Sequence, residues 1–187
     1  MGEDSTHINE FLMFELVDLS NDIDKITKLI IKFDELSKEM CDKYELRIKE
    51  KKLDVIDYTE LRKYSKENLL NTLVINYPCD SPFIKKDLNE DLRKEVRWYM
   101  NGYWIAHYYY DENNFENVKD ILQFQQETSM KENINTLDYF SWGLPSSVSL
   151  GLSIDRWLQM VLDVENLYTI ADPLSLGYSE RKLVKNK

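Results

Sequence analysis

The clearest pattern along the chain is an apolar stripe that repeats every three or four residues between positions 23 and 48. Its members are Ile23, Ile26, Ile30, Phe33, Leu36, Met40, Tyr44 and Ile48. This spacing places the apolar side chains on one face of an α-helix and leaves interspersed Glu and Lys residues on the others. Ser20, Asp22 and Asp24 stand where a capped helix would begin. The pattern predicts a long amphipathic helix that ends near Lys52 and needs partner elements to cover its stripe.

The other apolar segments are also interpreted as helices, because the chain has only five Gly and four Pro residues to make turns. The segments predicted as helices are 58–77, 88–110, 115–127 and 154–167. Residues 8–19 fit a helix, and the run is short enough to fit a strand. Together these segments predict an all-α fold, which is a single-domain bundle of six or seven helices over residues 1–187. Residues 1–7 and 180–187 are expected to be mobile.

Several polar residues mark the expected helix boundaries. Asp57-Tyr-Thr-Glu60 resembles a capping box, and Pro78 would end the helix after it. Asp87 is expected to cap the helix over 88–110. Residues 111–114 form the next break, where Asn113 or Asn114 would cap the following helix.

The stretch RWYMNGYWIAHYYY, residues 97–110, carries seven aromatic rings and one of the two histidines. On a helix, one straight apolar stripe would consist of Leu92, Val96, Tyr99, Tyr103, Ala106 and Tyr110. Gly102 in mid-helix costs about 1 kcal/mol relative to Ala, which suggests close approach of a neighbouring helix. We expect the stripe to be core and some of Trp98, Tyr108 and Tyr109 to be partly exposed, because Trp and Tyr are enriched at interfaces. Burial of the whole cluster in the core is the alternative.

The chain is acidic, with 34 Asp and Glu against 24 Lys and Arg and a net charge of −10. Residues 111–172 alone hold 11 acids and three bases, whereas residues 25–110 are close to balance. Such a chain repels nucleic acid phosphates and attracts basic proteins. The alternative is that the acids only confer solubility.

Little in the sequence points to catalysis. Phosphate-binding glycine loops and HExxH are absent, and the two histidines, His7 and His107, stand in no nucleophile–base motif. Cys41 and Cys79 are far apart and are interpreted as free thiols. We therefore predict that the protein is not an enzyme and has no cofactor and no metal site. With no signal-peptide pattern and no apolar run near the ~18–20 residues of a membrane span, a cytoplasmic protein is expected.

Aromatic anchors next to carboxylates are what a surface needs to bind a basic partner, since rings supply hot spots and acids steer association. The acidic region begins where the aromatic stretch ends. The predicted partner-binding residues are Trp98, Tyr108, Tyr109, Asp111, Glu112, Glu116 and Asp120.

In size, charge and expected helicity the chain resembles the small acidic all-helical immunity proteins of bacterial contact-dependent inhibition and polymorphic toxin systems. Gly102-Tyr103-Trp104 is similar to a G-Y-W element of one such family, although Ile105, Ala106 and His107 replace the E-A-A-like run that comes next there. The resemblance implies an immunity protein that binds and neutralises a cognate basic toxin domain, a nuclease by expectation, in the cytoplasm. The alternatives are a helical regulatory or phage-defence protein-binding module and a DNA-mimic inhibitor. Exposed aromatic residues would also allow a homodimer.

Overall fold

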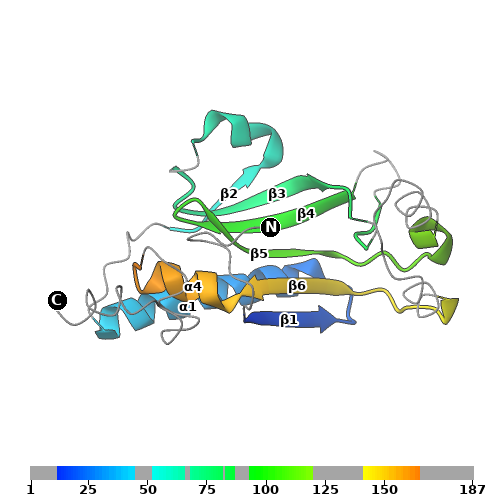
Figure 1. Ribbon diagram of the computed structural model, residues 1–187, viewed down its shortest axis with the longest axis horizontal. Coiled ribbons are helices and arrows are strands. Elements are labelled where there is room, and N and C mark those ends of the chain that lie inside the picture. Colours follow the sequence, from blue (N-terminus) through cyan, green and yellow to red (C-terminus); the bar gives the residue numbers. More distant parts are fainter. Residues whose placement is uncertain are drawn as a thin grey trace, which may run out of the picture.

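A six-stranded β-sheet with helices packed on one face forms the centre of the structure (Figure 1). The computed structural model describes residues 12–44, 52–65, 68–81, 83–86, 93–119 and 141–164. The elements in chain order are β1 (Met13–Asp18), α1 (Ile23–Tyr44), β2 (Asp54–Asp57), the 3₁₀ helix η1 (Tyr58–Lys63), β3 (Asn71–Cys79), β4 (Arg93–Met100), β5 (Tyr103–Tyr110), β6 (Val148–Ser153) and α4 (Ile154–Val161). The strand order is β1-β6-β5-β4-β3-β2. Neighbouring strands are antiparallel except β2 and β3, which are parallel.

The all-α prediction is therefore wrong, and the largest error lies in the aromatic stretch. The segment predicted as one helix over 88–110 is a β-hairpin of β4 and β5, joined by Asn101 and Gly102. Both turn residues have positive φ, 49° and 80°, as a type I′ hairpin turn requires. The turn also contacts the rest of the sheet, because the amide groups of Asn101 and Gly102 donate to the carbonyls of Leu70 and Leu69. Gly102 thus serves a tight turn and not helix packing.

The helix predicted over 58–77 is also wrong. Asp57 is a helix cap, since its carboxylate accepts from the amide of Thr59, but the capped element is only the short η1. The chain then enters β3, where Leu73 and Val74 are buried on opposite faces of the sheet. A strand buried on both faces has no simple alternation of apolar and polar residues, which is why it resembled a helix.

Other predictions are confirmed. The amphipathic helix is α1, with Ile26 and Ile30 buried; its predicted extension past Tyr44 falls at 45–51, outside the described residues. Residues 8–19, for which a strand was the alternative, contain β1. The final helix begins at Ile154 as expected but ends at Val161, before the predicted end at 167. Asn114 caps the helical turn at 115–119 by accepting from the amide of Glu116.

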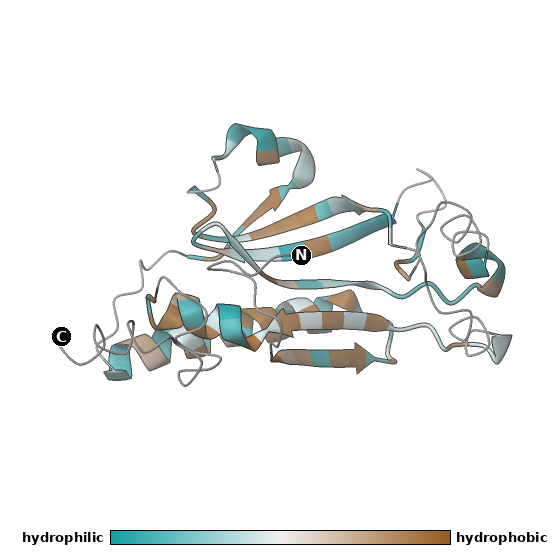
Figure 2. Cartoon of the chain, in the orientation of Figure 1, coloured by the Kyte–Doolittle hydropathy of each residue, from teal (hydrophilic) through white to brown (hydrophobic). Residues whose placement is uncertain are grey.

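One face of the sheet is covered by α1 and α4. Helix α1 packs against β5 and β6, while α4 packs against β1, β5 and β6. The main core lies between these layers, and its fully buried members include Ile26, Ile30, Leu73, Trp98, Tyr108, Leu150 and Leu152. Figure 2 shows the hydrophobic residues along β1 and β6 beside the two helices.

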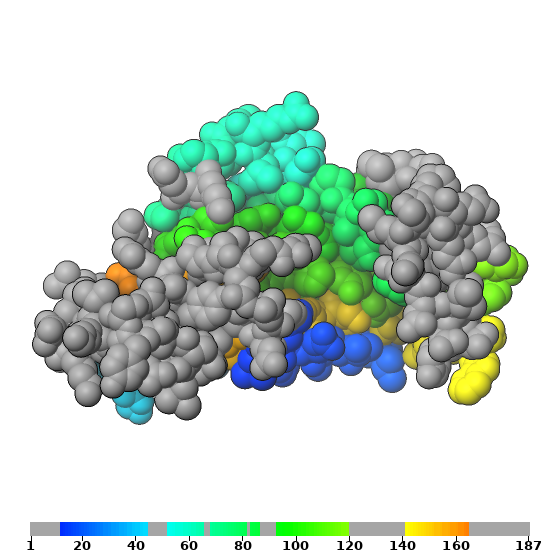
Figure 3. All heavy atoms as spheres, viewed as in Figure 1, coloured from blue at the N-terminus to red at the C-terminus, as the bar shows by residue number. Residues whose placement is uncertain are grey.

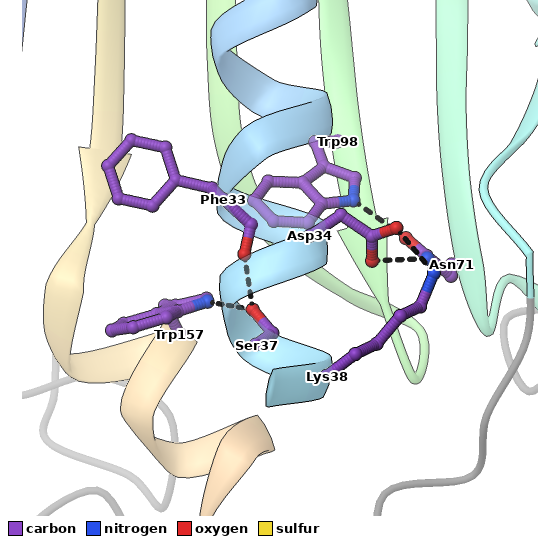
Figure 4. Close-up of polar contacts among 7 residues, drawn as sticks. All are labelled: Phe33, Asp34, Ser37, Lys38, Asn71, Trp98 and Trp157. Atoms are coloured by element: carbon purple, nitrogen blue, oxygen red, sulfur yellow. Dashed lines mark hydrogen bonds and ion pairs between the residues drawn. The ribbon is translucent and has the colours of Figure 1, made fainter. Parts of the chain in front are cut away.

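A buried polar network fixes α1 against this face (Figure 4). Asp34 of α1, only 4% exposed, accepts from the side-chain Nδ2 of Asn71 at 2.7 Å, and Trp98 Nε1 donates to the side-chain Oδ1 of Asn71 at 2.9 Å. Lys38 completes the network through an ion pair of 2.8 Å with Asp34. On the same helix, Ser37 accepts from Trp157 Nε1 of α4 at 2.7 Å, which joins the two helices. Because buried polar groups are costly when unpaired, these bonds select one position of α1 on the sheet.

The strand β1 is one edge of the sheet. Leu12, Val17 and Leu19 are exposed by 61%, 57% and 64%, and Figure 3 shows β1 in blue at the molecular surface. Within the described ranges, no helix is long and apolar enough to cross a membrane. Cys41 is buried and Cys79 is half-buried, and both are free thiols, as predicted.

Gly102→Ala should destabilise the protein by about 1–2 kcal/mol, because an L-residue at a φ of 80° is strained. Urea unfolding with far-UV circular dichroism measures the free energy of unfolding. The matched control is Asn101→Gly, which also accepts positive φ and should be nearly neutral. Equal stability of Gly102→Ala and the parent chain would contradict the turn geometry.

Candidate functional site

The face of the sheet that neither α1 nor α4 covers carries a cluster of polar and aromatic side chains. Alternation along β4 places Trp98 and Met100 in the main core, and therefore Glu95, Arg97 and Tyr99 on the opposite face. Neighbouring strands add further rings to that face. We call the whole set the Arg97–His107 cluster; it consists of Tyr77 of β3, Glu95, Arg97 and Tyr99 of β4, and Trp104, His107 and Tyr109 of β5.

Glu95 is the buried centre of the cluster, at 3% exposure. It accepts from Arg97 Nε through one carboxylate oxygen, and the other lies 2.8 Å from His107 Nδ1. Burial alone would raise the pKa of Glu95, but the hydrogen bonds from His107 and Arg97 outweigh it, so the pKa lies below its ordinary value. Glu95 is therefore a carboxylate at neutral pH and anchors two side chains from adjacent strands.

Arg97 is held between two aromatic rings. Its guanidinium carbon lies 3.6 Å from the ring centre of Tyr77 and 4.2 Å from that of Trp104. Burial would lower the pKa of Arg97, whereas hydrogen bonds to Glu95 and Tyr99 raise it above its ordinary value. The side chain keeps 17% of its surface exposed, so a fixed cation is presented at a half-buried aromatic surface.

His107 of β5 contacts Glu95 of the neighbouring strand β4 and two aromatic rings of its own strand. Trp104 and Tyr109 approach it edge-on, with ring centres 5.2 and 5.3 Å away. Across the strand pair, His107 is opposite Gly151 of β6. Burial of Tyr109, together with the negative charges of Asp111 and Glu95, raises its pKa to about 12. Its phenol thus stays neutral, and the His107 side chain remains 27% exposed.

The predicted partner-binding residues do not form one exposed surface. Trp98, Tyr108 and Glu112 are buried, with exposures of 0%, 1% and 2%. Trp98 bonds to Asn71, and the Tyr108 hydroxyl lies 3.0 Å from Thr27 Oγ1. Of Trp98, Tyr108 and Tyr109, some of which were expected to be partly exposed, only Tyr109 is half-buried, because strand alternation points Trp98 and Tyr108 into the core.

The remaining predicted residues are more accessible. Tyr109 and Asp111 are half-buried, and Asp111 accepts hydrogen bonds from the hydroxyls of Ser147 and Ser149. Glu116 is exposed and forms a 3.7 Å ion pair with Lys119. Asp120 lies outside the described residues. That these residues bind a protein partner stays a prediction.

Sequence reasoning missed Tyr77, Glu95 and Arg97 as members of one site. The sequence signal for this site was the dipeptide Asn101-Gly102, which predicts a β-hairpin turn. In the strand before such a turn, alternate side chains point to the same face, so Glu95 and Arg97 would lie on one face of the sheet. In the described part of the chain, no group of three or more His, Cys, Asp or Glu side chains could hold a metal ion.

Comparison with known proteins identifies solved structures of similar fold but assigns the chain to no family. No protein-family profile matches the chain, and neither does any curated protein sequence. Solved structures with a similar fold include the Entamoeba histolytica asparaginyl-tRNA synthetase in complex with asparaginyl-adenylate, with a TM-score of 0.62 and 12% sequence identity. The match covers 87% of this chain but 46% of the synthetase chain, so this chain spans about half of that protein's length.

Glu95→Gln should lower the free energy of unfolding by roughly 1–3 kcal/mol at pH 7, because Arg97 and His107 lose an ionised partner. The folded-state pKa of Glu95 is lowered, so its stabilisation is present above the ordinary value of 4.5 and is lost as the pH falls through the lower folded value. Urea unfolding of both proteins at pH 7 and at a series of values below 4.5 should therefore show a shrinking difference.

The control is Glu35→Gln, which removes an exposed ion pair with Lys32 on α1. It should change stability by less than about 1 kcal/mol at pH 7. A difference between Glu95→Gln and the parent chain that stays constant down the pH series would contradict the buried, ionised state of Glu95.

Proposed function

We propose that this chain binds a small nucleotide-activated acid of the aminoacyl-adenylate class on the sheet face opposite α1 and α4. The observation that carries the proposal is the Arg97–His107 cluster, in which a fixed guanidinium and half-buried rings share that face. The chain is proposed as a binding protein, and turnover is not part of the proposal.

The chemistry of the cluster matches that ligand class in two respects. An aminoacyl-adenylate carries a planar purine, and aromatic side chains such as Tyr77 and Trp104 stack on nucleobases. It also carries an anionic phosphate, for which a planar guanidinium is a good hydrogen-bond partner. The similarity of fold to a synthetase whose structure holds asparaginyl-adenylate supports the same class of ligand.

The charge of the chain argues for a small ligand over a nucleic acid. A net charge of −10 disfavours binding to a polyanion, since phosphate contacts from Lys and Arg dominate such affinity. A single phosphate needs only local positive charge, and Arg97 stays ionised. The proposed ligand is therefore a free adenylate and not a tRNA.

Isothermal titration calorimetry with two probes, AMP and the sulfamoyl analogue of asparaginyl-adenylate, tests the proposal. We expect saturable binding of the analogue, and weakening by roughly tenfold or more in Arg97→Lys, which keeps the charge beside Glu95 but loses the planar, stacked guanidinium. Lys32→Gln on α1 is the control and should bind like the parent chain. Absence of binding for both probes would overturn the proposal.

The immunity-protein interpretation is the second candidate, favoured by the net charge of −10 and the exposed Glu116. A basic toxin domain would then bind the acidic region that begins at Asp111 in the cytoplasm. Co-expression with the toxin encoded by a neighbouring gene tests this candidate, and both rescue of growth and a stable complex are expected. Survival without a complex, or a complex without rescue, would count against it.

A further inference from the structure

The outer side of β1 is a long and regular strand edge (Figure 1). β1 pairs with β6 over six consecutive residues without a register shift, and among the described residues no strand lies on its other side. The opposite edge of the sheet differs, since β2 has only four residues and runs directly into η1. We propose that β1 is the docking site for an extended strand of a basic partner protein, which adds to the sheet beside β1 and places a Lys or Arg opposite Glu15.

The backbone groups of β1 point alternately to β6 and to the outer edge. The Leu12 carbonyl accepts from the amide of Ile154, and the Leu12 amide donates to the carboxylate of Asp155, so both backbone groups of Leu12 point to the β6 side. Hydrogen-bonded and non-hydrogen-bonded residues alternate along an antiparallel pair. Every second residue after Leu12 therefore bonds to β6, while the N–H and C=O groups of the residues between them point outwards. These outward residues are Met13, Glu15 and Val17.

The same three residues carry their side chains on the sheet face opposite α1. Met13 Cε and the His107 ring lie on one side of Gly151, and this side is the face of the Arg97–His107 cluster. Met13 and Val17 are exposed by 38% and 57%, and Glu15 between them is exposed as well. An added strand would thus cover two apolar side chains that flank a carboxylate.

The other face of β1 is also incompletely covered. Phe14 contacts Phe33 of α1 edge-on, with ring centres 5.8 Å apart, yet it remains 36% exposed. Leu16 is half-buried against the main core. A neighbouring strand would therefore bury apolar surface on both faces of β1, which a single exposed side chain does not offer.

The charge of the edge indicates a basic partner and disfavours a second copy of the chain. Residues 12–24 contain four acids and no Lys or Arg. If two β1 strands paired antiparallel with Met13 opposite Val17, Glu15 would lie opposite Glu15 of the second copy. Like charges directly opposite each other destabilise a strand pair, whereas opposite charges stabilise it. A shift of this pairing by two residues would place Glu15 opposite an apolar side chain.

The alternation along β1 defines the sequence of a strand that fits. Opposite Met13, Glu15 and Val17 the partner presents an apolar, a basic and an apolar residue, and its intervening side chains lie beside Phe14 and Leu16. Main-chain hydrogen bonds to the outward groups supply affinity, and the side-chain alternation supplies specificity. This partner-binding role goes beyond adenylate binding and does not rest on it.

Amide hydrogen exchange on the full chain, measured by NMR, tests whether the edge is open. In the free chain we expect the outward amides of Met13, Glu15 and Val17 to exchange faster than the alternate amides that bond to β6. Light scattering gives the oligomeric state of the same sample. Protected outward amides in a monomer would overturn the proposal, because the chain would then cover its own edge. Protected outward amides in a dimer would overturn it in favour of a second copy.

A short synthetic peptide with Val-Thr-Lys-Thr-Val at its centre is the binding probe for isothermal titration calorimetry. We expect saturable binding, weakened roughly five- to tenfold when Glu replaces the central Lys of the peptide. Glu15→Lys should reverse this preference. The control is Glu60→Lys, the same charge change on η1 at the opposite edge, which should keep the preference for the Lys peptide. Absence of binding, or an unchanged preference in Glu15→Lys, would overturn the proposal.

Two modified peptides test main-chain pairing without any change to the protein. N-methylation of the central Lys removes the N–H that bonds to the Glu15 carbonyl and should weaken binding roughly tenfold or more. N-methylation of a neighbouring Thr removes an N–H that points away from β1 and should leave binding within about threefold. Equal affinities of the two methylated peptides would overturn strand addition.

Discussion

The two-residue turn at Asn101 and Gly102 sets the register on which the rest of the sheet depends. Because side chains alternate across a strand, this turn decides at once that Trp98 and Tyr108 enter the core and that Arg97 and His107 lie opposite each other on the other face. A shift by one residue would exchange the two faces, bury a guanidinium under α1 and expose two large rings. The turn therefore links the stability of the core to the arrangement of the candidate site.

The position of α1 is the second constraint. The Asp34–Asn71–Trp98 network connects the helix to β3 and β4, so that the helix layer lies on one face only. On the other face, a cation packed between aromatic rings and paired with Glu95 lies beside a smaller apolar cluster around Val74. Such a surface is rigid without being apolar, which suits recognition of a small charged ligand.

Local patterns located α1 and the start of α4, but they also predicted helices where β3, β4 and β5 lie. The stripe around Ile26 and Ile30 and the caps at Asp57 and Asn114 depend on neighbours in sequence, and they are confirmed. The candidate site could not be predicted in the same way, because the pairing of Glu95 with His107 depends on the register of two strands. Periodicity was also misleading in β5, where Ile105 is an extra residue at a bulge and Ala106 is buried beside it. The Asn-Gly dipeptide was the one local signal that favoured a hairpin.

The exposed edge strand β1 affects how the protein behaves in concentrated solution. An edge strand with exposed apolar side chains such as Met13 and Val17 is a template for adding strands from other chains. Glu15 and Asp18 are the charges on that strand, and Asp18 holds its charge in mild acid because hydrogen bonds from Ser20 lower its pKa. The chain as a whole approaches zero net charge near pH 4.8. At this edge, the negative charges of Glu15 and Asp18 oppose the addition of a strand from another copy of the chain.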